Sequence, residues 1–97
     1  MKISEVDIGY IKDYINAEYE KDSVINMIEK AAKSYIINFT GISEEELDNY
    51  EDLTIAFLVL CTDFYDQRNF ILTENYNGLN VNILVDNILN MYSRNLL

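Results

Sequence analysis

The chain has 97 residues, 49% of them hydrophobic, which is enough for one modest core but not for two, so we expect a single domain over residues 1–97. Seventeen acidic and seven basic residues give a formal net charge of −10, which excludes the cationic surface that nucleic-acid recognition requires. One cysteine and no histidine leave no disulfide, no zinc-ligand spacing and no Cys/His nucleophile pair. We therefore expect no enzyme, no metal site and no cofactor.

Neither end of the chain nor its interior has the pattern of a membrane segment. The first ten residues contain two carboxylates and lack the apolar core of a signal peptide. No apolar run approaches the roughly twenty residues that a membrane span needs. The sequence thus predicts a soluble protein made in the cytoplasm, with no membrane partner.

The first predicted helix has apolar residues at helical spacing on one side. Asp7 can cap this helix, and a polar connection over residues 16–22 follows it. The apolar positions are Ile8, Ile11, Tyr14 and Ile15.

The clearest helix is predicted over residues 24–39, where apolar residues recur at steps of three and four. We expect either Asp22 or Ser23 to cap its start. Gly41 stands where a left-handed C-terminal cap is needed. Glu29 and Lys33 are spaced for an ion pair within the helix.

The segment that begins at Ser43 has the pattern of a capping box. In that motif the Ser43 hydroxyl accepts a hydrogen bond from the third helical amide, and the Glu46 carboxylate accepts one from the amide of Ser43. A short helix through Leu47 or Asp48 should follow. Consecutive carboxylates over residues 44–46 favour a helix start over a metal site, because they splay in different directions.

A third long helix, opened by Asp52 or a neighbour, is apolar nearly all round from Leu53 to Phe64, and we expect it to continue to Asn69. A helix without a polar face is buried on several sides. Its surplus apolar surface, Leu58 included, is covered either by a neighbouring subunit or by the other helices of the chain. The sequence leaves both alternatives open.

Polar residues near the end of this helix include two carboxylates at helical spacing, Asp63 and Asp66. Two carboxylates alone do not specify a metal or an acid–base mechanism. We expect a solvated helix face beside Arg68. Cys61, within the apolar part of the helix, is expected to be a buried thiol.

Residues 70–79 show no sustained periodicity and predict a loop that is mobile in the lone subunit and orders in an assembly. Asn80 is expected to cap a last helix, and the tail from Ser93 to Leu97 is expected to fray. The inward stripe of that helix should be Val81, Leu84, Val85, Ile88, Leu89 and Tyr92. Together these elements predict an all-α fold, a compact bundle of about four main helices plus a short capped helix, with a long loop before the last helix.

Candidate interface residues come mainly from the aromatic residues, since aromatic side chains are enriched at protein interfaces. The candidates that lie outside the clean helical stripes are Tyr50, Phe70 and Tyr76. Leu58 joins them from the apolar helix, and Leu79 from the end of the predicted loop.

Several segments, taken in order, resemble a known family. They are Met1-Lys2-Ile3-Ser4; Ala31-Ala32-Lys33-Ser34-Tyr35-Ile36 with Phe39-Thr40-Gly41; Asp52-Leu53-Thr54-Ile55-Ala56; and Phe64-Tyr65-Asp66-Gln67-Arg68. The series resembles the tailed-phage head–tail connector family, the small ring-forming connector or adaptor proteins of phages and prophages. Most of the chain takes part in this resemblance.

The resemblance implies a structural virion protein without catalytic activity. Its subunits would form a homo-oligomeric ring, twelve-fold in the virion, beneath the portal protein. That ring would extend the DNA channel and dock head-completion or tail proteins. The expected location is the head–tail junction of the virion, with the host cytoplasm as the place of assembly. DNA would pass through the ring without specific nucleic-acid binding.

The resemblance also marks two further positions, Tyr65 and Arg68, as structural or interface residues. Tyr65 could equally be a residue at the edge of the core, and Arg68 could pair with Asp63 or Asp66. The segment after Arg68 departs from the family pattern, because it lacks proline and is rich in asparagine.

A second function fits the same charge. An acidic DNA mimic or inhibitor module would bind a basic protein through carboxylates at phosphate-like spacing. The acidic residues are spread along the chain with one concentration over residues 44–52, which favours the connector hypothesis.

Overall fold

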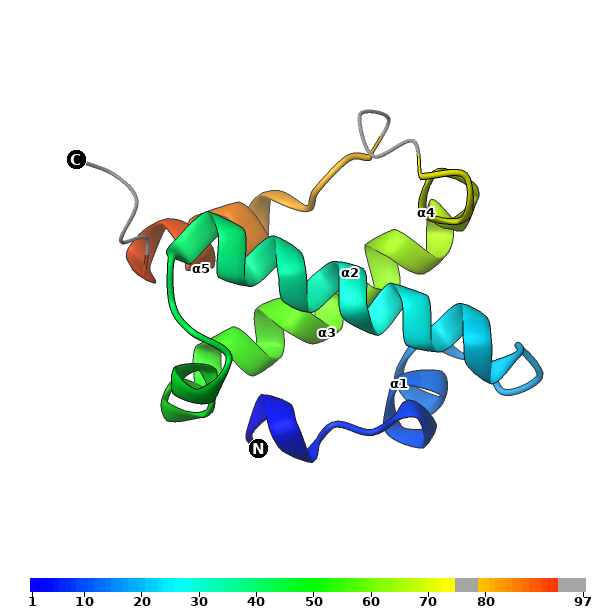
Figure 1. Cartoon of the computed structure of the whole chain (residues 1–97), viewed down its shortest axis with the longest axis horizontal. Helices are drawn as coiled ribbons and strands as arrows, with labels where there is room; N and C mark the ends of the chain where they lie inside the picture. Colours follow the sequence, from blue (N-terminus) through cyan, green and yellow to red (C-terminus); the bar gives the residue numbers. More distant parts are fainter. Residues whose placement is uncertain (75–78, 93–97) are drawn as a thin grey trace.

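The computed structural model of the chain describes residues 1–74 and 79–92, except for the side chain of Phe70. Within these residues the fold is all-α, as predicted, and contains no strand (Figure 1). In chain order the elements are η1 (Ile3–Glu5), α1 (Ile8–Ile15), α2 (Asp22–Thr40), η2 (Glu45–Asn49), α3 (Glu51–Asp66), α4 (Arg68–Leu72) and α5 (Ile83–Tyr92).

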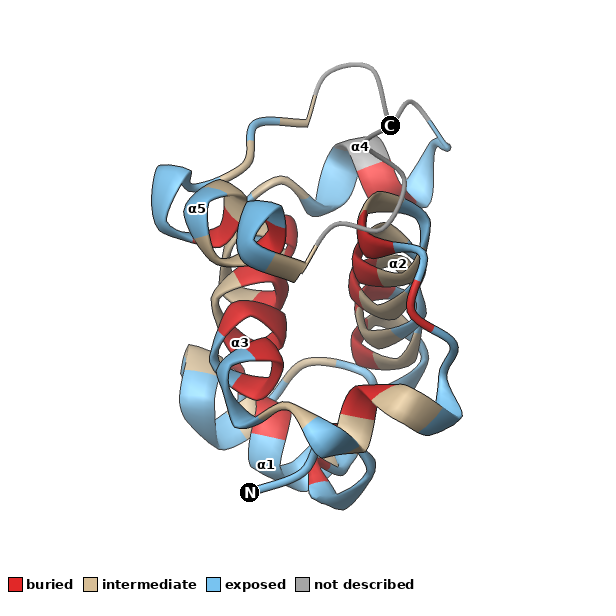
Figure 2. Cartoon of the chain, turned by 90° about the vertical axis from the view of Figure 1, so that its left-hand side faces the viewer, coloured by how far each residue is buried: buried red, intermediate tan, exposed pale blue. Residues whose placement is uncertain are grey.

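The central helix of the bundle is α3, which contacts each of the other helices and both 3₁₀ turns. Figure 2 shows α2 and α3 as two neighbouring columns with their buried sides facing each other, and α5 lying next to α3. The other helices therefore cover most of the apolar surface of α3. Of the two alternatives, coverage within the chain accounts for most of that surface, and Ile55, at 52% exposed, is the main exception.

The core follows the predicted helical stripes. It is formed by residues from all the long helices together with anchors from the connecting segments. Its largest fully buried side chains are Ile11, Ile25, Ile28, Ile36, Ile42, Leu47, Leu53, Phe57, Leu60, Phe64, Ile71 and Leu89.

The ends of the first two helices bear out some of the expected caps. The Asp7 carboxylate accepts a hydrogen bond from the amide of Tyr10 at 2.8 Å, so Asp7 caps α1 as predicted. Gly41 adopts the left-handed conformation, with φ of 75°, and ends α2. The prediction of Asp22 or Ser23 as N-cap of α2 is wrong: the helix already includes Asp22, whose carboxylate pairs with Lys12 of α1.

The predicted capping box at Ser43 does not form as expected. The Ser43 hydroxyl donates to the Glu46 carboxylate at 3.0 Å instead of accepting from an amide. The turn that follows, η2, is a 3₁₀ helix whose N-cap is Glu44. The Ser43 half of the motif is thus replaced by a contact between two side chains.

Two helix boundaries near the predicted loop also differ from the sequence prediction. The helix predicted to continue to Asn69 ends at Asp66, and Gln67 separates it from α4, so residues 70–72 are helical and not part of a loop. This break brings Ile71 into the core, where it is 1% exposed. The last helix starts at Ile83, and the Asn82 side chain, not that of Asn80, accepts a hydrogen bond from the amide of Leu84 at 2.7 Å.

Candidate protein-interaction site

The C-terminal end of α3 holds the segment that leads into α5. The side chain of Gln67 pairs with the backbone of Asn80: its Nε2 donates to the carbonyl at 2.7 Å, and its Oε1 accepts from the amide at 2.6 Å. One turn earlier, the Asp63 carboxylate accepts from the amide of Asn82 at 3.0 Å. We call this arrangement of Asp63 and Gln67 on residues 80–82 the polar clamp.

Asp63 is therefore not the freely solvated carboxylate that the sequence suggested. Partial burial raises the pKa of Asp63, and the nearby negative charge of Asp66 raises it further. The hydrogen bond from the Asn82 amide acts in the opposite direction and lowers it. The clamp fixes the start of α5, so it also fixes which face of α5 is turned outward.

Helix α5 binds to the bundle through one side only. Val85 and Leu89 are fully buried, and the Tyr92 hydroxyl donates to Asp52 at the far end of α3 at 3.0 Å. Since Asn82 bonds to Asp63 and Tyr92 to Asp52, α5 runs antiparallel to α3.

The outer side of α5 carries large apolar side chains beside the polar Asn87 and Asn90. Three large side chains lie there: Ile83 is 75% exposed, Leu84 49% and Met91 73%. We call these three residues the α5 stripe; Figure 2 shows the outer, exposed side of this helix. The prediction that Leu84 faces inward is wrong, because the clamp and the buried pair Val85 and Leu89 orient the helix differently. Large exposed apolar side chains on one side of a helix are candidates for a protein contact.

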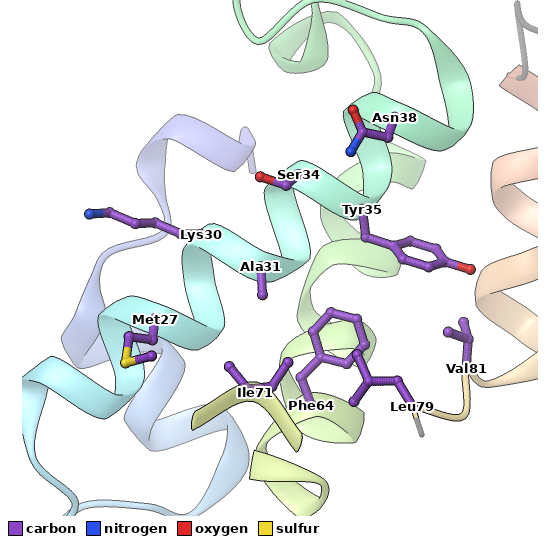
Figure 3. A pocket seen from close by; sticks show the side chains of 10 residues that line it. All are labelled: Met27, Lys30, Ala31, Ser34, Tyr35, Asn38, Phe64, Ile71, Leu79 and Val81. Atoms are coloured by element: carbon purple, nitrogen blue, oxygen red, sulfur yellow. The ribbon is translucent and has the colours of Figure 1, made fainter. Parts of the chain in front are cut away.

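An apolar groove lies between α2, α4 and the segment before α5 (Figure 3). Its volume is about 650 Å³. The lining residues are Met27, Lys30, Ala31, Ser34, Tyr35 and Asn38 of α2, Phe64 of α3, Ile71 of α4, and Leu79 and Val81. We call it the α2–α4 groove. Lys30 is the only charged residue among them.

The inner wall of the groove is aromatic. The rings of Tyr35 and Phe64 meet edge to face, with their centroids 6.1 Å apart. Burial raises the pKa of Tyr35, and the charge of Asp86 adds to this effect, so the phenol stays neutral. The groove therefore offers apolar and neutral polar contacts, and the Lys30 side chain points away from Ile71, Leu79 and Val81 (Figure 3).

The predicted interface residues are not gathered on one surface. Tyr50 is half-buried and its ring packs against Tyr92 with centroids 5.0 Å apart. Leu58 is 8% exposed and packs in the core, so it offers little surface to a partner in this conformation. Leu79 is half-buried and lines the α2–α4 groove.

Tyr65 and Arg68 contact each other. The Arg68 guanidinium lies over the Tyr65 ring, 4.7 Å from its centroid, and also donates to the Tyr65 carbonyl at 3.1 Å. The Tyr65 hydroxyl donates to Glu20 at 3.2 Å. Arg68 thus contacts Tyr65 and forms no ion pair with Asp63 or Asp66. The Phe70 side chain and the whole of Tyr76 lie outside the described residues.

Sequence reasoning missed the α5 stripe. Ile83 and Met91 were assigned to no function, although two large apolar residues flank the polar positions Asn87 and Asn90 on one side of a helix. The sequence therefore did contain a pattern that indicates this surface, because a helix with apolar residues on two sides is expected to pack against other protein surface on both.

The acidic segment predicted at residues 44–52 is largely engaged within the chain. Asp48 accepts from the amide of Ser4 at 3.0 Å, and hydrogen bonds from Ser4 lower the pKa of Asp48. Glu44 lies 3.8 Å from Lys33, and Asp52 accepts from Tyr92. These contacts join the acidic segment to η1, α2 and α5.

Among the described residues, no group of three or more Asp, Glu, Cys or His side chains could hold a metal ion. None of the helices in that part of the chain has the length and apolar character to cross a membrane. The Cys61 thiol is buried, and burial, with a contribution from Glu29, raises its pKa to about 12.

Comparisons with known proteins add no further identification. No protein-family model, no curated protein and no solved structure matches this chain.

Proposed function

We propose that this chain is a structural subunit that assembles with copies of itself into the head–tail connector ring of a tailed phage or prophage. The observation that carries the proposal is the α5 stripe, three large apolar side chains that are about half to three-quarters exposed on one helix. The other helices pack on α3, and in the described part of the chain these three side chains stay exposed. Surfaces of this kind mark protein contacts.

The charge of the subunit is consistent with this role. Ten net negative charges keep a small protein dispersed and repel the phosphate backbone of DNA. A ring of such subunits lets DNA pass without holding it. The proposed partners are further copies of the chain, the portal protein, and a head-completion or tail protein, at the head–tail junction.

The native mass of the purified protein, measured by light scattering behind size-exclusion chromatography over a range of concentrations, tests the proposal. Rings of about a dozen subunits, visible by negative-stain microscopy, are expected at high concentration or when portal rings are added. A strict monomer at every concentration, also in the presence of portal protein, would contradict it.

An acidic DNA mimic or inhibitor is the second candidate. The observation in its favour is that α3 and α5 carry only acidic charged side chains. Against it, carboxylates of the acidic segment are committed to Ser4, Lys33 and Tyr92. Salt-sensitive binding of a monomer to one basic protein, with loss of binding when exposed carboxylates are replaced by amides, would favour this function over the connector.

A further inference from the structure

Helices α3 and α5 each turn one row of apolar side chains outward. On α3 the exposed Ile55 is followed one turn later by the half-buried Val59. On α5, Leu84, Ile88 and Met91 recur at steps of four and three residues, and Leu84 and Met91 are exposed. Residues at this spacing share one side of a helix.

Contacts with α2 fix the direction of both rows. The Phe64 ring of α3 meets Tyr35 of α2 edge to face, and Phe64 follows Ile55 by about two and a half turns. Ile55 is thus on the side of α3 opposite to α2. The charge of Asp86 on α5 acts on the same Tyr35, and Asp86 is about 200° round the helix from Leu84. Both rows therefore point away from α2.

Hydrogen bonds at the two ends of α5 hold the rows side by side. The Tyr92 hydroxyl donates to Asp52 at one end. The amide of Asn82 donates to Asp63 at the other end, so the two helices are antiparallel. Ile55 follows Asp52 by about one turn and lies beside the turn of α5 that precedes Tyr92. We call the combined surface the α3–α5 face; it consists of Ile55, Val59, Leu84, Ile88 and Met91.

Carboxylates lie at both ends of the α3–α5 face. Glu51 is about one turn before Ile55 and Asp66 is about three turns after it, so both continue the same row on α3. Both are exposed, as is Asp52, which contacts Tyr92 at the end of α5. The face is therefore apolar along its middle and acidic at its ends.

Few cations balance these carboxylates. Neither α3 nor α5 contains a lysine or an arginine. The terminal ammonium of Met1 lies 3.9 Å from Glu51, whereas the Arg68 guanidinium lies over the Tyr65 ring. Within the described part of the chain, no basic group forms an ion pair with Asp52 or Asp66. The charge that borders the face is therefore negative.

We infer that the α3–α5 face binds an amphipathic helix of a partner protein, in which lysine or arginine borders the apolar side. Such a helix lays its apolar side along the apolar surface of two neighbouring helices. Its cations meet Asp52 at one end of the face and Asp66 at the other. The same face of a second copy is a poor occupant, because an isologous contact would bring the acidic ends of the two copies together.

The inference goes beyond the proposed function, since it gives the chemistry of a protein that docks on the connector. Ile83 lies about 100° round α5 from Leu84 and is outside the face, so it remains for contacts between copies. The contact also differs from that of a DNA mimic, because apolar side chains form it and carboxylates only border it.

Two synthetic peptides of the same composition test the inference. In one, leucine recurs at helical spacing and lysine fills the other positions; in the other, the same residues are scrambled so that no apolar side forms. Isothermal titration calorimetry at physiological ionic strength should show the first peptide binding the full chain at least about tenfold more tightly than the second. Charge attraction alone would bind both peptides equally.

Variants at exposed positions show whether the face is responsible. Ile55→Gln combined with Met91→Gln removes apolar surface, keeps good helix formers and should abolish the preference for the helical peptide. Glu51→Gln combined with Asp66→Asn should keep the preference, weaken the binding of both peptides and reduce its dependence on salt. Tyr14→Gln, an exposed substitution on α1, is the matched control and should bind like the wild type. Circular dichroism and urea midpoints equal to those of the wild type establish that each variant folds.

Equal binding of the two peptides by the wild type, or an undiminished preference in the variant with Ile55→Gln and Met91→Gln, would overturn the inference. Light scattering on the same samples tests the proposed function separately. A wild type that prefers the helical peptide but stays monomeric at every concentration, with and without portal protein, supports the inference and contradicts the connector ring. Loss of assembly in the variant with Ile55→Gln and Met91→Gln would assign the face to a copy of the chain and overturn the inference.

Discussion

Replacing Gln67 by alanine tests whether the polar clamp holds α5 on the bundle. The side chain makes two hydrogen bonds to the backbone of Asn80, of 2.7 and 2.6 Å, and a third to the Asp63 carbonyl at 3.2 Å. A net contribution of about 0.5–1.5 kcal/mol for each bond sets the scale. Since Asn80 is exposed, water can replace part of the hydrogen bonding that the Gln67 side chain provides. We therefore expect the free energy of unfolding to fall by about 1–2 kcal/mol.

Urea denaturation followed by circular dichroism measures this loss. For a domain of this size each kcal/mol corresponds to a fall of about 4–8 °C in Tm. Asp66→Ala is the control, because Asp66 is exposed one position before Gln67, and it should change stability by less than about 0.5 kcal/mol.

Gln67→Glu refines the same test. The glutamate keeps an acceptor for the Asn80 amide but loses the donor and places a negative charge against the Asn80 carbonyl. Its folded-state pKa is thereby raised above the unfolded value, so the variant should lose stability as the pH rises through that pKa and regain it in acid. A stability of Gln67→Ala within about 0.3 kcal/mol of the wild type would refute the clamp as an energetic feature.

Three further predictions concern α5, the half-buried Asp63 and the buried Cys61. Leu89→Ala should cost about 2–5 kcal/mol in urea denaturation, because the side chain is fully buried, whereas Met91→Ala should cost less than about 0.5 kcal/mol. Burial raises the folded-state pKa of Asp63, so ionisation of this carboxyl lowers the stability of the fold. The wild type should therefore gain stability relative to Asp63→Asn as the pH falls through that pKa. A difference in stability between the two proteins that is the same at pH 7 and pH 3 would contradict this. The Cys61 thiol, with a pKa of about 12, should resist a thiol reagent at pH 8 in the native protein and react on unfolding; rapid native reaction would disprove its burial.

The helices with a narrow apolar stripe were predictable from sequence. On α2 the periodic positions Ile25, Ile28, Ala32 and Ile36 are all fully buried. One well-defined stripe allows only one orientation of a helix on its core, so periodicity alone gives the right face. The Asp7 and Gly41 caps were predictable for a similar reason, since both depend on local backbone chemistry.

The boundaries near α4 and α5 depend on contacts between distant residues, and local patterns do not contain them. Asn80 and Asn82 are equally suitable caps by residue type. Asn82 is the cap, because the backbone of Asn80 is hydrogen-bonded to the side chain of Gln67, thirteen residues away in sequence. The break after Asp66 has a tertiary origin as well, because it lets Ile71 reach the core.

The candidate site was the least predictable part. A broad apolar pattern on α5 permits more than one inward face, and the sequence favoured the one that contains Leu84. The face that is buried is decided by where α3 lies and by the hydrogen bonds at Asp63 and Asp52, which anchor the two ends of the helix. The α2–α4 groove involves four separate segments, so only the folded chain brings its walls together.

Because α3 lies at the centre of the fold, it also limits how early the chain can fold during its synthesis. The first turn, η1, is held by groups far along the chain: the Thr54 hydroxyl donates to the Met1 carbonyl, and Asp48 accepts from the amide of Ser4. Helices α1 and α2 likewise pack on α3, which follows them. A ribosome must therefore release the whole of α3 before the N-terminal half can complete its packing, and folding during translation begins late, past the middle of the chain.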